Sequence, residues 1–90
     1  MVNAIVSVIG RDQIGICAAV CTKMADYRIN ILDITQTIVQ GNFTMVMAVD
    51  IENAAASFGE IKGGLAELGE GMGLDIRMQR QEIFDAMYNI

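Results

Sequence analysis

Apolar residues gather in four segments of the chain, and each segment predicts a β-strand. Residues 2–9 are apolar at nearly every position, which is typical of a central strand buried on both faces. Residues 29–39 and 43–51 follow as a pair around Gly41-Asn42, a two-residue hairpin signal. Residues 74–79 alternate between apolar and polar side chains, which predicts a last, half-buried strand.

Two further segments carry apolar residues at helical spacing. The first predicts a helix over residues 15–26, after a glycine-bounded turn at residues 10–15. The second helix is expected to begin at Asn53, a good N-cap, and to end among the glycines of residues 69–73. Its apolar stripe consists of Phe58, Ile61, Leu65 and Leu68. Three internal glycines predict a close approach to the sheet or to the other helix: Gly59, Gly63 and Gly64.

The order strand, helix, strand, strand, helix, strand predicts a ferredoxin-like α/β sandwich, with two helices on one face of an antiparallel sheet. Right-handed crossovers place the first and third strands side by side at the centre. We expect this single domain to occupy residues 1–81, because 90 residues are too few for two separate cores.

The hairpin signal also predicts a strand register. If Gly41-Asn42 is the loop, Gln40 pairs with Phe43. Asp33 then lies opposite Asp50 on the outer face, as two solvated carboxylates or as flanks of a bound cation. The inner, core-facing set comprises Leu32, Ile34, Gln36 and Ile38 with Met45, Met47, Val49 and Ile51.

The C-terminal segment, residues 82–90, exceeds what this fold needs. It has apolar residues at helical spacing, which predicts a short helical extension. Its apolar face has to be buried on something, and we expect a second copy of the chain. The face consists of Ile83, Phe84, Met87 and Ile90.

Composition narrows the classes of function. The chain is 53 % hydrophobic, carries a formal net charge of −5 and contains no histidine. A nucleic-acid surface needs a basic stripe, and a membrane span needs about 20 apolar residues in a row. Neither is present in the sequence. We therefore predict no direct contact with nucleic acid or membrane.

Two cysteines, Cys17 and Cys21, lie four positions apart in the first predicted helix. They form no disulfide framework and no signal peptide precedes them, which indicates the cytoplasm. We interpret them as small buried hydrophobic residues, because a metal or redox site would need a third ligand.

The turn before the first helix holds the candidate binding chemistry. Gly10 and Gly15 are spaced as at the start of a phosphate-binding loop, but Ile16-Cys17 stand where that motif needs Lys and Ser or Thr. What remains is a plain connection, or a turn whose backbone N–H groups attract a carboxylate. No nucleophile–base arrangement accompanies it, so we predict no enzyme, no catalytic residue and no cofactor.

Three motifs resemble those of ACT domains. Residues 10–16 resemble their Gly-x-Asp-x-x-Gly-Ile turn, residues 24–31 resemble the helix end that leads to Asn-Ile, and residues 43–45 resemble the opening of their third strand. The tail, residues 83–90, is similar to the end of a family of stand-alone bacterial ACT proteins, the UPF0237 group.

This resemblance implies a regulatory module that binds a small ligand, usually an amino acid, at a homodimer interface. In the family pattern the first loop and the start of the second strand line the site. That implies ligand-binding roles for Asp12, Gly15 and Ile16, with Asn30 and Ile31 coming from across the interface. The Gly15 and Ile16 N–H groups suit a carboxylate, and Asp12 or Asn30 suits an ammonium.

Ile14 and Ile31 beside this site favour a ligand the size of glycine or serine. An alternative from another class is a ligand-free interaction module that docks on an unknown enzyme or regulator. A third is metal binding through acidic side chains. The sequence shows no catalytic or DNA-binding domain on which a bound ligand would act.

Overall fold

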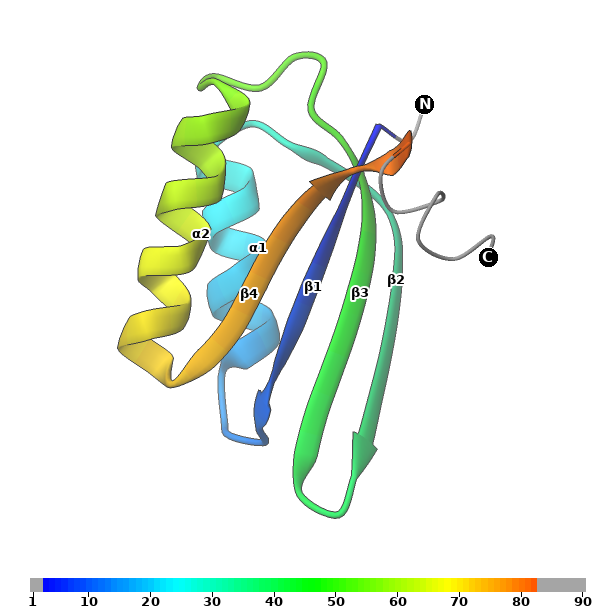
Figure 1. Cartoon of the computed structure of the whole chain (residues 1–90), viewed down its shortest axis with the longest axis vertical. Helices are drawn as coiled ribbons and strands as arrows, with labels where there is room; N and C mark the ends of the chain where they lie inside the picture. Colours follow the sequence, from blue (N-terminus) through cyan, green and yellow to red (C-terminus); the bar gives the residue numbers. More distant parts are fainter. Residues whose placement is uncertain (1–2, 83–90) are drawn as a thin grey trace.

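The computed structural model describes residues 3–82 as a four-stranded antiparallel sheet with two helices on one face (Figure 1). The elements are β1 (Ala4–Arg11), α1 (Ile16–Asp26), β2 (Asn30–Val39), β3 (Asn42–Asp50), α2 (Phe58–Met72) and β4 (Leu74–Arg80). The strands lie in the order β2-β3-β1-β4. The predicted ferredoxin-like sandwich is therefore confirmed, with the first and third strands at its centre.

The hydrophobic core lies between the helices and the inner face of the sheet. In its middle, Val6 of β1 pairs with Met47 of β3 on one side and with Met78 of β4 on the other, and all three are buried. The helices contribute Met24 and Ile61, which are both fully buried. The β3 methionines are thus core residues, as predicted, since flexible thioethers fill irregular gaps.

The two helices begin differently. Among the described residues no side chain caps α1, which follows the left-handed Gly15. The N-cap of α2 is Ser57, whose hydroxyl accepts a hydrogen bond from the Glu60 N–H at 3.2 Å. The N-cap predicted at Asn53 is therefore wrong. Ser57 satisfies a donor of the first helical turn, and its spacing to Glu60 is that of a capping box.

Two glycines let α2 lie close to its neighbours. At Gly64 a Cβ atom would overlap the hydroxyl of Tyr27, the C-terminal cap of α1. At Gly69 it would lie 2.6 Å from the Leu74 carbonyl oxygen of β4. The predicted close approach is confirmed at Gly64, whereas the other two glycines named from the sequence face open space.

The hairpin between β2 and β3 turns at Gln40-Gly41 instead of Gly41-Asn42. Both turn residues have positive φ, 51° and 79°, as a two-residue hairpin turn of the primed type requires. Ile38 pairs with Phe43, where the sequence predicted Gln40. The register is thus shifted by two residues, and the strand faces are kept because side chains alternate with a period of two.

The observed register separates the two carboxylates that were expected to face each other. Asp33 lies opposite Ala48, and Asp50 lies opposite Asn30. A β-bulge between Ile31 and Asp33 adds to the difference. The predicted cross-strand pair is therefore wrong. The cation site that needed Asp33 and Asp50 opposite each other is wrong as well.

Strand β2 forms an edge of the sheet that the helices leave uncovered (Figure 1). Ile34 and Ile38 stand opposite buried β3 residues, yet they are 39 % and 58 % exposed. At the bulge Leu32 is exposed, and Ile31 packs against the core in its place. The predicted core face is therefore right for β3 and wrong for most of β2.

The predicted helical extension lies outside the described residues from residue 83 onward, so its apolar stripe and its role stay predictions. Beyond the end of β4, the Gln81 N–H donates to the Asn3 carbonyl at 3.1 Å and so holds residue 81 beside the start of β1. Between residues 3 and 82, no helix has the length and apolar character needed to cross a membrane.

Candidate functional site

The turn between β1 and α1 is held on two sides by hydrogen bonds. The Asp12 N–H donates to the Gly41 carbonyl of the β2–β3 turn at 2.8 Å. The Gln13 side-chain amide donates to the Met72 carbonyl at the end of α2, also at 2.8 Å. The contact of Gln13 could not be predicted from the sequence, because no local pattern marks a hydrogen bond between residues so far apart in the chain. These two hydrogen bonds therefore fix the conformation of the turn in the absence of a ligand.

Gly15 sets the geometry at the start of α1. Its φ of 89° lies in the left-handed region that glycine adopts without strain, and its carbonyl accepts the Ala19 N–H at 2.9 Å. In the described chain, no side chain caps this helix and its first turn holds no acidic residue. The first turn of α1 therefore has uncapped backbone donors, including that of the exposed Cys17, at the positive end of the helix dipole.

The side chains of this turn differ in what they offer a ligand. The Asp12 carboxylate is exposed, and Ile14 is fully exposed at 101 %. Ile16 is 2 % exposed and belongs to the core. Because this value covers the whole residue, neither the side chain nor the backbone N–H of Ile16 presents much surface to a ligand, whereas Cys17 beside it is exposed.

Asn30 and Ile31 lie at the opposite end of α1. That helix has 11 residues and spans about 16 Å, which separates Gly15 from the start of β2. Asn30 is exposed, whereas Ile31 is half-buried against the core. Within one chain the five predicted residues thus form two groups. One group is Asp12, Gly15 and Ile16, and the other is Asn30 and Ile31.

Asp50 takes part in a hydrogen-bonded cluster that joins β3 to the start of β1. The Asn3 amide donates to the Asp50 carboxylate at 3.0 Å, and the Glu52 N–H donates to the same oxygen at 2.9 Å. The Ile51 N–H in turn donates to the Asn3 side-chain oxygen at 2.8 Å. The hydrogen bond from Glu52 is the largest cause that lowers the pKa of the Asp50 carboxyl. Asp50 is thus a structural carboxylate.

Cys17 and Cys21 lie on one face of α1, with their sulfur atoms 3.9 Å apart. Cys17 is exposed and Cys21 is partly exposed, so their interpretation as buried hydrophobic residues is wrong. The core-facing side of α1 is filled by larger residues, including Val20 and Met24. Burial, followed by the hydrogen bond with Cys17, raises the pKa of the Cys21 thiol. Across residues 3–82 no three His, Cys, Asp or Glu side chains are grouped to hold a metal.

The fold and the glycine turn define a class of protein. The ACT domain model matches residues 3–79, from the start of β1 to the end of β4, and the chain belongs to the ACT domain family. Its relatives narrow this to the UPF0237 group. The chain is 48 % identical over 90 residues to the UPF0237 protein of Bifidobacterium longum, and the match covers 100 % of both chains.

Solved structures agree with this assignment. The ACT domain protein from Streptococcus pneumoniae has a TM-score of 0.80 and 32 % identity, over 92 % of this chain and 93 % of that one. The regulatory subunit of aspartate kinase from Thermus thermophilus has a TM-score of 0.69 and 22 % identity, over 88 % of this chain and 51 % of that one. The second likeness is one of fold alone.

Proposed function

We propose that this protein is a regulatory module that binds a small amino acid between two copies of the chain and catalyses no reaction itself. The observation that carries the proposal is the start of α1, where uncapped backbone donors follow Gly15 and the exposed Asp12 carboxylate lies in the same turn. A free amino acid presents a carboxylate to such donors and an ammonium to such an acceptor. Glycine and serine are the preferred ligands.

The uncovered edge of β2 supports the involvement of a second copy. Edge strands are normally protected by charges, proline or a covering element. Among its 10 residues β2 carries a single charged residue, Asp33. It instead exposes apolar side chains, including Ile38 and Val39, which are 58 % and 59 % exposed. Antiparallel pairing with another β2 strand would cover this edge and satisfy its free backbone groups.

Such a pairing would also complete the site. Antiparallel strands run in opposite directions, so the start of β2 in one copy lies beside the end of β2 in the other. The end of β2, Val39, adjoins the turn whose Gly41 carbonyl accepts the Asp12 N–H. Asn30 and Ile31 of a second copy would thereby approach the Asp12 turn, which they cannot reach within one chain.

Membership of the ACT family supports a regulatory role, as does the likeness in fold to a regulatory subunit of aspartate kinase. The two unpaired thiols, Cys17 and Cys21, support a place in the reducing cytoplasm. The apolar β2 edge equally favours the alternative, a ligand-free module that docks on another protein. The two functions differ in whether a free amino acid binds.

Titration calorimetry of the full chain against the twenty amino acids tests ligand binding. We expect glycine or serine to bind more tightly than about 1 mM. Asp12→Ala and Asn30→Ala each remove a hydrogen bond worth about 1–3 kcal/mol, so affinity should fall roughly 5- to 150-fold. Gly15→Val should abolish binding, because the left-handed backbone disfavours a branched side chain. Glu67→Ala, an exposed acid on α2, is the matched control and should bind as wild type.

If no amino acid binds wild type below about 1 mM, the interaction-module function replaces this proposal. Sedimentation velocity tests the β2 edge separately. Ile38→Lys should convert a dimer into a monomer and abolish ligand binding, whereas Ala66→Lys on the exposed face of α2 should leave both unchanged. Deleting residues 83–90 measures how much the predicted tail adds to association. A wild-type monomer at micromolar concentration would refute pairing through β2.

A further inference from the structure

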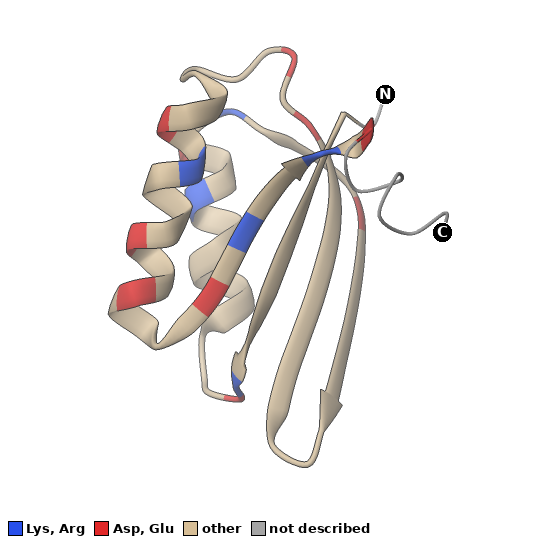
Figure 2. Cartoon of the chain, viewed as in Figure 1, with Lys and Arg blue, Asp and Glu red and all other residues tan. Residues whose placement is uncertain are grey.

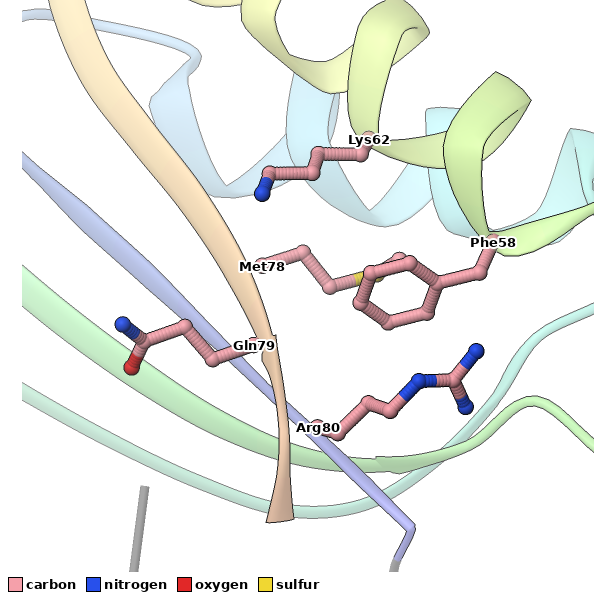
Figure 3. Close-up of a pocket in the computed structure, with 5 residues that line it drawn as sticks. All are labelled: Phe58, Lys62, Met78, Gln79 and Arg80. Atoms are coloured by element: carbon pink, nitrogen blue, oxygen red, sulfur yellow. The ribbon is translucent and has the colours of Figure 1, made fainter. Parts of the chain in front are cut away.

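A cavity of about 260 Å³ opens between the first turns of α2 and the end of β4 (Figure 3). It is lined by Phe58, Lys62, Met78, Gln79 and Arg80. The Asp12 turn is attached to the other end of α2, at Met72, and this helix of 15 residues spans about 22 Å. The cavity is therefore separate from the proposed amino-acid site.

The apolar part of the cavity consists of the Phe58 ring and the Met78 side chain. The Arg80 guanidinium lies over that ring, 4.4 Å from its centroid. Stacking on an aromatic face leaves the N–H donors at the edge of a guanidinium free to bind in its plane. Arg80 is thus held in position while its hydrogen-bonding capacity is still unused.

Two basic side chains, Lys62 and Arg80, line this cavity, and among the described residues no acidic side chain lines it with them. Within the part of the chain that the structure describes, neither Lys62 nor Arg80 forms a hydrogen bond or ion pair, and no carboxylate lines the cavity. Arg77, on the same strand, is in contrast paired with Asp75 at 3.2 Å. Figure 2 shows how few basic positions there are, and the whole chain has 6 basic against 11 acidic residues. A pair of unmatched cations in such an acidic chain favours an anionic ligand.

The arrangement of the side chains narrows the shape of that ligand. Figure 3 shows Lys62 and Arg80 on opposite sides of the apolar floor formed by Met78 and Phe58. A volume of about 260 Å³ lies just below the range of roughly 300–1,000 Å³ that is typical of small-molecule sites. A ligand that fits these side chains would be small, apolar in the middle and negatively charged at both ends.

We propose that this cavity binds a small linear dicarboxylate, with one carboxylate on Arg80, the other on Lys62, and the methylene spacer against Phe58. The fork of the Arg80 guanidinium matches a carboxylate, and the Lys62 ammonium supplies a second point charge. Glutarate is small, carries a carboxylate at each end and lacks the amino group that the proposed amino-acid site requires, so it is the probe for this cavity.

Titration calorimetry of the full chain with glutarate, at low salt and in a buffer free of phosphate and carboxylate, tests the proposal. We expect one site per chain with a dissociation constant below about 1 mM. Pentanoate, which has one carboxylate, should bind at least about tenfold more weakly, and so should Lys62→Gln and Arg80→Gln with glutarate. Arg77→Gln is the matched control, since it removes a charge from the outer face of the same strand.

Glutarate binding weaker than about 1 mM overturns the proposal, and so does equal affinity for pentanoate. Unchanged affinity in both Lys62→Gln and Arg80→Gln also overturns it. Phe58→Leu keeps both charges and should weaken binding through the lost ring, with thermal unfolding as the check that the fold persists. Gly15→Val, which should abolish binding at the amino-acid turn, should bind glutarate as wild type does. Loss of glutarate binding in that variant would assign it to the amino-acid turn, so this proposal and the proposed function fail separately.

Discussion

Replacing Gly69 by alanine should destabilise the protein, although alanine is the better helix former. A Cβ atom at Gly69 would lie 2.6 Å from the Leu74 carbonyl oxygen and 3.1 Å from Ile76 Cγ1. The nearer of these is a backbone atom of β4, which cannot move away as the end of a flexible side chain would. The helix and the strand must therefore separate, or the helix must shift along its axis.

The expected magnitude follows from two opposing terms. Alanine in a helix interior gains about 1 kcal/mol over glycine, whereas overpacking a core contact loses about 1–3 kcal/mol. For a contact with backbone we take the upper part of that range, which leaves a net loss of about 1–2 kcal/mol. Gly63→Ala is the matched control in the same helix, because nothing lies within 4 Å of its added Cβ. It should stabilise the protein by up to about 1 kcal/mol.

Urea unfolding at one fixed chain concentration measures both variants, with equal slopes as the check that the transition is unchanged. A domain of this size shifts by roughly 4–8 °C in melting temperature per kcal/mol, so the two variants should move in opposite directions by several degrees. If both alanines stabilise the protein to the same extent, the close packing of α2 on β4 is refuted.

Three further predictions concern single groups. Because the pKa of Asp50 is lowered in the folded state, its contribution to stability is complete above the unfolded value and is lost as pH falls through the folded value. Asp50→Asn should therefore lose stability at neutral pH and show a smaller further loss below about pH 4 in thermal melts. Ser57→Ala should lose about 1 kcal/mol in urea unfolding, since it removes the cap of α2; an unchanged midpoint would contradict that role. Iodoacetamide should modify Cys17 before Cys21, because the Cys21 thiol is more buried and its pKa is raised; peptide mass spectrometry that finds the reverse order would contradict it.

The fold was predictable because local signals agreed with one another. Apolar runs marked the central strands, and Gly15 marked the start of α1. The register of β2 against β3 was not predictable in the same way. A shift by two residues keeps every side chain on its own face, so the hydrophobic pattern fits both registers equally. The conformation of the turn sets which of the two registers forms. In that turn Gln40 has a positive φ of 51°, at a position where asparagine is the commoner residue.

The candidate site was predictable in part. The Asp12 turn has a sequence signature, and the structure shows its backbone geometry and its attachments. The predicted helix and strand already place Asn30 and Ile31 beyond the far end of α1. Whether a second chain brings them to the Asp12 turn depends on packing between chains, which no local pattern encodes. The contact between Phe58 and Arg80 was missed, because it joins the start of α2 to the end of β4 and the pattern of each segment predicts its own structure but not which residue of the other it meets.

The two outer strands of the sheet differ in a way that limits how far chains can assemble. In β4, three of 7 residues are charged, namely Asp75, Arg77 and Arg80, and the first two are paired. Charges of this density discourage a further strand from pairing there, while β2 carries one charge along its length. If two chains pair through β2 as proposed, each outer edge of the joined sheet is a charged β4 strand. Strand pairing through β2 would therefore stop at a dimer, because the remaining edges are charged and do not favour the addition of further chains to a fibre.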